Sequence, residues 1–300
     1  MKGITAQHII EHGAESLLPE RKEPIGPVLL RALLSLPDGT VLGKKTLNWA
    51  DPLFLCLGAM FALGGGTGFR KAEVALPGGT AFNDRRVRRA SLLWEIDGAV
   101  YADPSPAQLR GLVPLRDKAI IKPPRSKGDQ DGTKFGAHPI YQIYDPADIA
   151  NAAAWLLRIE LRFPRRGAYR LITPLFFSEA RKYTCISHST ADTYLAHLLH
   201  YVVPHDKVTC YSFHSFRIGF ACALLAAGCP YDMIQALARW RSVESVKIYA
   251  RINPSDYTTW VSQALLQDTT SHTTARLPVI DAHGIVATFG LATNFFADAA

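Results

Sequence analysis

An almost unbroken run of apolar residues constrains the fold of this chain more than any other segment. After Asp51-Pro52 the sequence reads LFLCLGAMFALGGG. A helix that is apolar on every side has to be buried on every side, and this run is too short to span a bilayer. The sequence therefore predicts a buried central helix that begins at Asp51-Pro52 and ends at Gly64-Gly65-Gly66.

Other segments have the pattern of helices that could pack around this one. They combine apolar residues at helical spacing with Pro, Asp or Ser at their starts and with Gly or Pro after their ends. Residues 1–21 carry little pattern and are interpreted as an arm or the remnant of another domain. The expected helices cover about 23–36, 145–163, 189–201, 216–227, 230–240 and 253–266.

Two stretches change to the alternating pattern of strands. SLLWEI and AVYAD flank Asp97-Gly98, a pair that favours a tight hairpin turn. Residues 119–122 and 138–144 suggest a second strand pair, separated by a polar, glycine-rich loop. The predicted fold is therefore mainly α with a small antiparallel β-sheet, an α+β class.

Charge and cysteine content narrow the function classes. The 300 residues carry a formal charge of +7, which favours an anionic partner, nucleic acid first. The five cysteines are scattered without a Cys-x-x-Cys pair, so neither a disulfide framework nor a zinc site is suggested. No apolar signal-peptide core opens the chain. We expect no cofactor, no metal and no membrane partner, and a cytoplasmic location, or a nuclear one in a eukaryote.

The chemistry is concentrated between Cys210 and Arg251. His214 and Arg217 project from one helical face, so an imidazole and a guanidinium can converge on one small anion. Trp240 and Tyr249 would face opposite sides of an unbroken helix. Ser242 is a suitable N-cap for a new short helix, and such a break would let both side chains share a site. Each residue alone has an ordinary structural explanation; the argument depends on their joint order.

That order resembles the carboxyl-terminal signature of the tyrosine recombinase (phage integrase) superfamily: His-x-x-Arg, then a His or Trp, then a nucleophilic Tyr. A second segment, TGFRKAEV, looks like the family's first arginine box, commonly Thr-Gly-Leu-Arg-x-x-Glu-Leu, and it does not meet the phosphate-loop pattern. The resemblance implies a recombinase catalytic-domain-like fold. It implies the catalytic set Arg70, Lys127, His214, Arg217, Trp240 and Tyr249, with Glu73 as the partner of Arg70.

The sequence offers three candidates for the lysine of this set. In the family it lies on a β-hairpin between the first arginine and the His-x-x-Arg box, and Lys127 is the preferred candidate. Lys122 and Lys134 remain alternatives, because hairpin loops vary in length. The resemblance also implies roles: Lys127 protonates the departing 5′ oxygen, His214 accepts a proton or orients the nucleophile, and Trp240 donates to a phosphate oxygen.

A separate basic cluster precedes the first hairpin. Neutralising backbone phosphates would make DNA binding salt-dependent, although a solvated charged face is an equal alternative. The cluster consists of Arg85, Arg86, Arg88 and Arg89.

The predicted organisation is an arm or remnant at 1–21, a catalytic domain at 22–268 and a tail at 269–300. The helical core-binding domain usual in the family has no room upstream, so we expect a fragment, a minimal member or reliance on a partner. The segment around HSFRIG looks closer to recombinases of eukaryotic mobile elements. The expected function is cleavage and rejoining of double-stranded DNA through a 3′-phosphotyrosyl intermediate, by a homotetramer on DNA. A type IB topoisomerase and a non-catalytic DNA-binding remnant are the alternatives.

Overall fold

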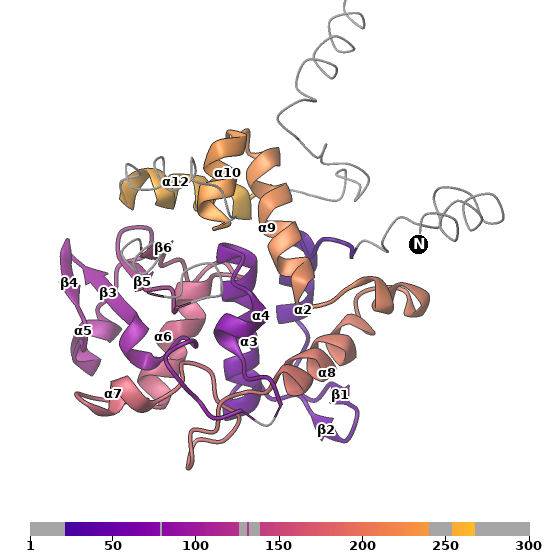
Figure 1. Ribbon diagram of the computed structural model, residues 1–300, viewed down its shortest axis with the longest axis horizontal. Coiled ribbons are helices and arrows are strands. Elements are labelled where there is room, and N and C mark those ends of the chain that lie inside the picture. Colours follow the sequence, from indigo (N-terminus) through magenta and orange to yellow (C-terminus); the bar gives the residue numbers. More distant parts are fainter. Residues whose placement is uncertain (1–21, 79, 126–130, 132–138, 240–253, 268–300) are drawn as a thin grey trace, which may run out of the picture. The chain divides into compact units, whose positions relative to one another are not determined.

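The apolar segment forms helix α3 (Pro52–Thr67), against which α2 (Pro27–Leu34), α6 (Ala152–Arg162), α9 (His214–Ala226) and α12 (Pro254–Leu265) all pack (Figure 1). The computed structural model describes residues 22–78, 80–125, 131, 139–239 and 254–267. The Asp51 side chain accepts a hydrogen bond from the backbone N–H of Leu53, as expected of an N-cap. The predicted buried central helix and its start are confirmed.

The predicted end of this helix is wrong, because α3 continues through the three glycines. A Cβ atom added at Gly65 would lie 2.5 Å from Leu30, and one at Gly66 would lie 2.6 Å from the Gln142 side-chain oxygen. These glycines therefore permit close packing against neighbouring elements. The helix ends instead at Gly68, whose φ of 60° is left-handed and suits glycine.

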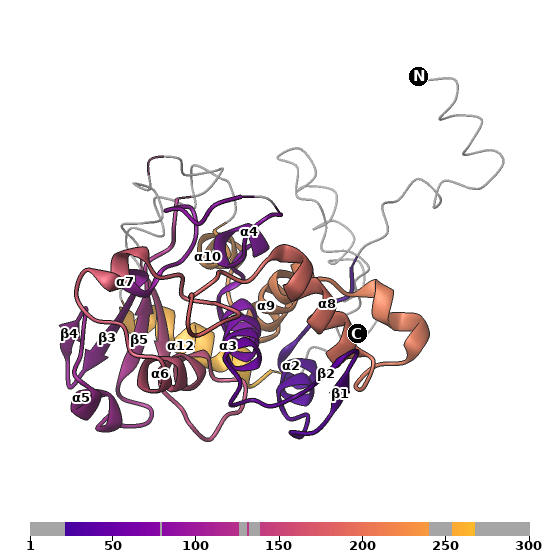
Figure 2. The same ribbon diagram turned by 90° about the horizontal axis from the view of Figure 1, so that it is seen from below.

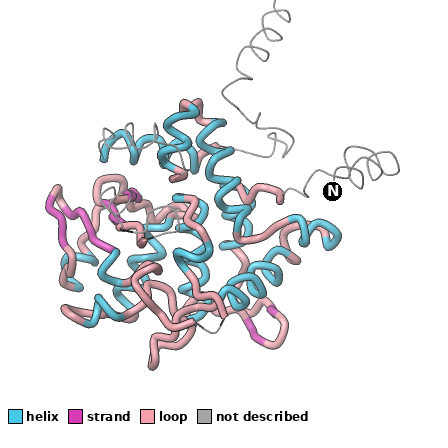
Figure 3. Tube along the Cα trace, viewed as in Figure 1, coloured by secondary structure: helices cyan, strands magenta, loops and turns pink. Residues whose placement is uncertain are grey.

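Both predicted strand pairs are present and belong to one antiparallel sheet (Figures 2 and 3). The strands are β3 (Leu92–Ile96), β4 (Ala99–Tyr101), β5 (Lys118–Ile121) and β6 (Ile140–Ile143), in the order β4-β3-β5-β6. Asp97 and Gly98 have φ values of 50° and 76°, the left-handed pair that a tight hairpin turn needs. The described residues thus form a mixed α+β fold in which helices predominate.

The remaining expected helices are found with changed ends. Helix α6 begins after Asn151, whose side chain accepts from the N–H of Ala154, and so starts later than the predicted Asp145-Pro146. Gly228 closes α9 with a φ of 79°. The others are α8 (His188–Leu199) and α10 (Tyr231–Leu237).

Several short elements were not anticipated, because two to six residues carry too little periodicity to be recognised. One is a separate hairpin of β1 (Val41–Leu42) and β2 (Lys45–Thr46). The others are α4 (Lys71–Val74), η2 (Arg89–Ser91), α5 (Pro106–Arg110), α7 (Tyr169–Ile172) and η3 (His205–Cys210).

All five cysteines are free thiols, as expected, and four of them are buried. Among the helices of the described residues, none has both the length and the apolar character that crossing a membrane requires. Some sequence predictions lie outside the described residues, and the proposed domain boundaries stay predictions. The positions concerned are Lys127, Lys134, Trp240, Ser242, Tyr249, the arm at 1–21 and the tail at 269–300.

Candidate functional site

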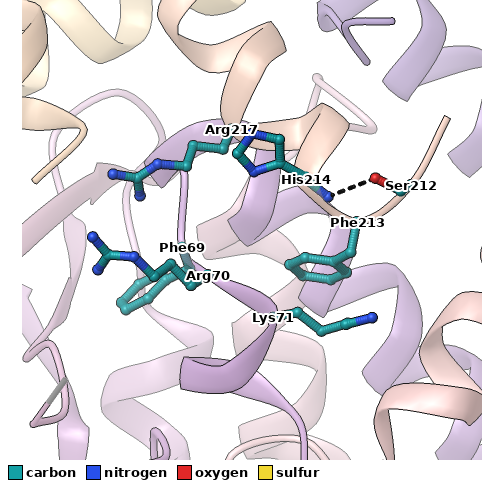
Figure 4. A pocket seen from close by; sticks show the side chains of 7 residues that line it. All are labelled: Phe69, Arg70, Lys71, Ser212, Phe213, His214 and Arg217. Carbon is teal, nitrogen blue, oxygen red and sulfur yellow. Dashed lines mark hydrogen bonds between the residues drawn. The ribbon is translucent and has the colours of Figure 1, made fainter. Parts of the chain in front are cut away.

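A pocket of about 350 Å³ forms where the turn after α3 meets the start of α9. Segments far apart in the sequence thereby bring Arg70, His214 and Arg217 to one place (Figure 4). Figure 4 shows the guanidinium groups of Arg70 and Arg217 turned to the same side of this pocket. Its lining consists of Phe69, Arg70, Lys71, Ser212, Phe213, His214 and Arg217.

Local hydrogen bonds fix the first turn of α9. The Ser212 hydroxyl accepts from the N–H of His214 at 3.3 Å, and the Ser215 hydroxyl accepts from the N–H of Ser212 at 3.0 Å. Further along the helix, a Cβ atom at Gly219 would lie 2.0 Å from the carbonyl oxygen of Ile25, so only glycine permits this approach. The N–H of Ile25 also donates to the carbonyl oxygen of Ser215 at 2.9 Å, which joins the chain before α2 to the first turn of α9, where His214 and Arg217 lie at the pocket.

Arg217 is a buried cation. The residue is only 5% exposed, and its Nη1 donates a hydrogen bond to the carbonyl oxygen of Gly68 at 2.7 Å. Burial, followed by the positive charges of Arg70 and Arg239, lowers the pKa of Arg217 to about 9. A bound anion would favour the charged form, so this environment is one that a phosphate group would stabilise.

Arg70 is the more exposed arginine of the pocket. Its Nη1 lies 3.0 Å from Oε1 of Glu73, and its backbone N–H donates to Oε2 of the same carboxylate at 2.8 Å. The Arg70 side chain remains 40% exposed, whereas that of Glu73 is 5% exposed. The neighbouring Lys71 is engaged elsewhere, because its ammonium pairs with Asp192 at 2.6 Å. Arg70 can therefore present unused donors to an anion.

His214 lies next to this positive charge. Desolvation of the ring, and then the charge of Arg217, lower the pKa of His214 below its usual value. The neutral imidazole is thus the favoured form at neutral pH, and a neutral imidazole can accept a proton.

Arg239 is a further member of this cluster, and sequence reasoning passed over it. Its guanidinium is buried at 1% exposure, lies 4.2 Å from the ring centre of Phe69 and donates to Oε2 of Glu73 at 2.9 Å. The guanidinium groups of Arg70 and Arg239 therefore share one carboxylate, and with the cation of Arg217 nearby the cluster keeps an excess of positive charge. The available signal was an arginine directly after the apolar end of a helix, where the sequence pattern would favour glycine.

The basic cluster before β3 divides into surface and core residues. Arg85 is exposed and Arg88 is half-buried. Arg86 is buried and donates to the carbonyl oxygen of Ala75 at 3.1 Å. Arg89 is 0% exposed. The expectation that all four arginines face DNA is therefore corrected, because the side chains of Arg86 and Arg89 are buried in the protein interior.

The hairpin expected to carry the catalytic lysine is present as β5 and β6, and Lys122 follows β5 directly. Lys122 is exposed and lines a second hollow of about 380 Å³, beside Arg88 and Arg125. Lys127 and Lys134 lie outside the described residues, so Lys122 is the one lysine candidate of the three that the structure places.

Comparison with known proteins relates one segment of the chain to a protein family. Residues 173–256 match the model of the phage integrase family. The match covers less than half of the chain and includes the positions of His214, Arg217, Trp240 and Tyr249, but not that of Arg70. No curated protein and no solved structure matches the chain. The resemblance to the tyrosine recombinase superfamily is thereby confirmed for this segment, and the match supports a DNA breaking and rejoining function in general.

Proposed function

We propose that this protein cuts and rejoins double-stranded DNA by the tyrosine recombinase route. The observation that carries the proposal is the convergence of Arg70 and Arg217, from remote segments, on one pocket beside His214. The family match over 173–256 supports the same chemistry. In the proposed reaction the phenolic oxygen of Tyr249 bonds to phosphorus while the bond from phosphorus to the 5′ oxygen breaks. The 3′-phosphotyrosyl link conserves the bond energy, so rejoining needs no ATP.

The two arginines would supply most of the rate acceleration. Negative charge builds on the non-bridging oxygens as the phosphorus becomes five-coordinate, and guanidinium forks match that arrangement with parallel N–H donors. Arg217 is held in a dry, preorganised position, where electrostatic stabilisation is stronger than in water. Arg70 has a partly exposed side chain and would contact the same phosphate from the turn after α3, whereas Arg217 would contact it from α9.

Two proton movements complete the step. The phenol of a free tyrosine has a pKa near 10, so its proton needs an acceptor, and the neutral imidazole of His214 suits this role. The departing 5′ oxygen takes a proton from a lysine of the loop after β5, for which Lys127 is our candidate and Lys122 the described alternative. Trp240 can donate its indole N–H to a phosphate oxygen but cannot transfer a proton.

The proposed partner is duplex DNA, gripped in part by Arg85 and Arg88, with a tetramer of this chain as the assembly that exchanges strands. Glu73 would act by holding Arg70 in place.

The deciding experiment uses a nicked suicide duplex, in which the cleaved strand end diffuses away and traps any covalent intermediate. Wild type, Tyr249→Phe and the matched control Tyr257→Phe are incubated with candidate sites and analysed on denaturing gels. We expect a covalent adduct with wild type and with Tyr257→Phe, and none with Tyr249→Phe. Salt-dependent DNA binding without any adduct would refute the proposed function and leave a DNA-binding remnant.

An adduct would still leave two enzyme classes open, and product analysis separates them. A recombinase joins ends from two different duplexes, whereas a type IB topoisomerase relaxes one supercoiled circle without joining partners. We expect joined products when two duplexes carry the same site.

A further inference from the structure

Arg239 connects three elements that meet at the pocket. It follows the end of α10, its guanidinium stacks on Phe69 in the turn after α3, and Nη2 donates to Glu73 in α4. Its carbonyl oxygen accepts from Nη2 of Arg70 at 3.4 Å. Side chain and backbone of this one residue thus contact both members of the Arg70–Glu73 pair.

The hydrogen bonds to Glu73 explain why Arg70 remains available. Oε2 of Glu73 already accepts from the backbone N–H of Arg70 at 2.8 Å and from Arg239 at 2.9 Å. A guanidinium binds a carboxylate most strongly when its two parallel N–H donors reach both oxygens. Because Arg239 occupies Oε2, the side chain of Arg70 is limited to Oε1, and its other donors are not drawn onto Glu73.

The backbone conformation of Arg239 favours glycine, so the presence of a long side chain there calls for a physical explanation. Its φ of 53° lies in the left-handed region, which glycine adopts without cost and which disfavours a side chain. Glycine would therefore suit this position better if only the end of α10 mattered. The strain is offset by a buried guanidinium that has a carboxylate and an aromatic ring as partners.

We infer that Arg239 is a positioning residue: it occupies one oxygen of Glu73 and offers its carbonyl to Arg70, and so keeps the Arg70 guanidinium turned to the pocket for phosphate. The inference rests on the proposed function, because its readout is the Tyr249-dependent adduct. Arg239 itself is too deeply buried to touch DNA. Removing the Arg239 side chain should therefore slow adduct formation in the DNA-bound complex and leave DNA binding itself unchanged.

The test measures single-turnover adduct formation on the nicked suicide duplex, as a rate at saturating DNA and as a half-saturating DNA concentration. Arg239→Gly removes the side chain without backbone strain, and we expect a rate about a hundredfold lower, the size of effect that a displaced catalytic group produces. The half-saturating concentration should stay near that of wild type. Arg239→Lys restores a positive charge beside Glu73 and should recover part of the rate.

Arg89→Lys is the matched control, because Arg89 is also buried and paired with a glutamate but does not line the pocket. We expect it to lower thermal stability and to leave the adduct rate unchanged. Phe69→Leu, which removes the ring under the guanidinium, serves if Arg239→Gly does not fold, and should lower the rate more mildly. Wild-type rates in folded Arg239 variants, or an equal loss in Arg89→Lys, would overturn the inference while the proposed function stands. A wild-type chain without any adduct would refute both.

Discussion

Replacing Glu73 by glutamine tests whether the positively charged cluster at the pocket binds an anion. The carboxylate is the counterion that Arg70 and Arg239 share, at 3.0 and 2.9 Å. Glutamine keeps the shape of the side chain but removes the charge. The variant therefore leaves a buried guanidinium with no opposite charge among the contacts described for it, the situation that makes half of a buried ion pair costly.

The expected loss follows from burial. Removing one partner of a buried pair costs about 3–5 kcal/mol, and the partial exposure of Arg70 places Glu73→Gln near the lower end, about 3 kcal/mol. For a domain of this size, that corresponds to a fall in Tm of about 6–12 °C. Thermal unfolding followed by circular dichroism measures it.

DNA should then compensate the variant. A phosphate in the pocket supplies the missing negative charge, and a ligand that binds only the folded state raises its stability. We therefore expect saturating duplex DNA to raise the Tm of Glu73→Gln by more than it raises that of wild type. The difference between the two shifts is the quantity to report.

Glu160→Gln provides the control, because Glu160 also lies between two arginines, Arg89 and Arg170, in the interior. Its loss of stability should reach the upper end of the range, since all three side chains are almost fully buried. Its DNA-induced shift should equal that of wild type. An equal DNA-induced shift for Glu73→Gln, or a loss below about 1 kcal/mol, would refute the reasoning.

Two further predictions concern single charges. Arg85→Ala should reduce the slope of log affinity for DNA against log salt by about 1 and leave stability unchanged. Arg89→Met should lower the free energy of unfolding by about 3–5 kcal/mol and leave that slope unchanged. Fluorescence anisotropy over a salt series measures the slope, and urea unfolding measures the stability. For His214, burial and then the neighbouring cation lower the pKa, so in Arg217→Gln, which removes the second cause, we expect an NMR titration to show a His214 pKa nearer its ordinary 6.5. Because the unfolded chain takes up this proton first as the pH falls below 6.5, wild-type stability should decrease there, and the decrease should be smaller in Arg217→Gln.

Local pattern was sufficient to predict the elements that have strong periodicity or decisive turn residues. The turn at Asp97-Gly98 and the buried character of α3 depend on neighbouring residues alone, and both are confirmed. The end of α3 was missed because the role of Gly65 and Gly66 depends on Leu30 and Gln142, which are distant in sequence. A glycine that ends a helix and a glycine that admits a close neighbour look the same in one sequence.

The pocket was predictable only in part, for the same physical reason. Family motifs indicated Arg70, His214 and Arg217, and the structure brings these three together. Motifs gave no indication of Arg239, because its role follows from where the end of α10 lies relative to Phe69 and Glu73. Arg86 and Arg89 were misjudged since a run of arginines predicts surface charge, while burial is decided by long-range packing.

The chain contains the same arrangement twice, a glutamate between two arginines, and the comparison indicates how a structural cluster differs from the cluster that we propose binds phosphate. Around Glu160 the arginine side chains are 0% and 4% exposed, so their donors are directed inward, to the glutamate and to backbone carbonyls. Around Glu73 one arginine is buried at 1% and the other remains 40% exposed. Each cluster pairs one glutamate with two arginines, and Arg170 of the first cluster also lies 3.8 Å from Asp103. The difference is that the guanidinium of Arg70 still reaches solvent, beside the buried cation of Arg217, and we propose that a phosphate enters there.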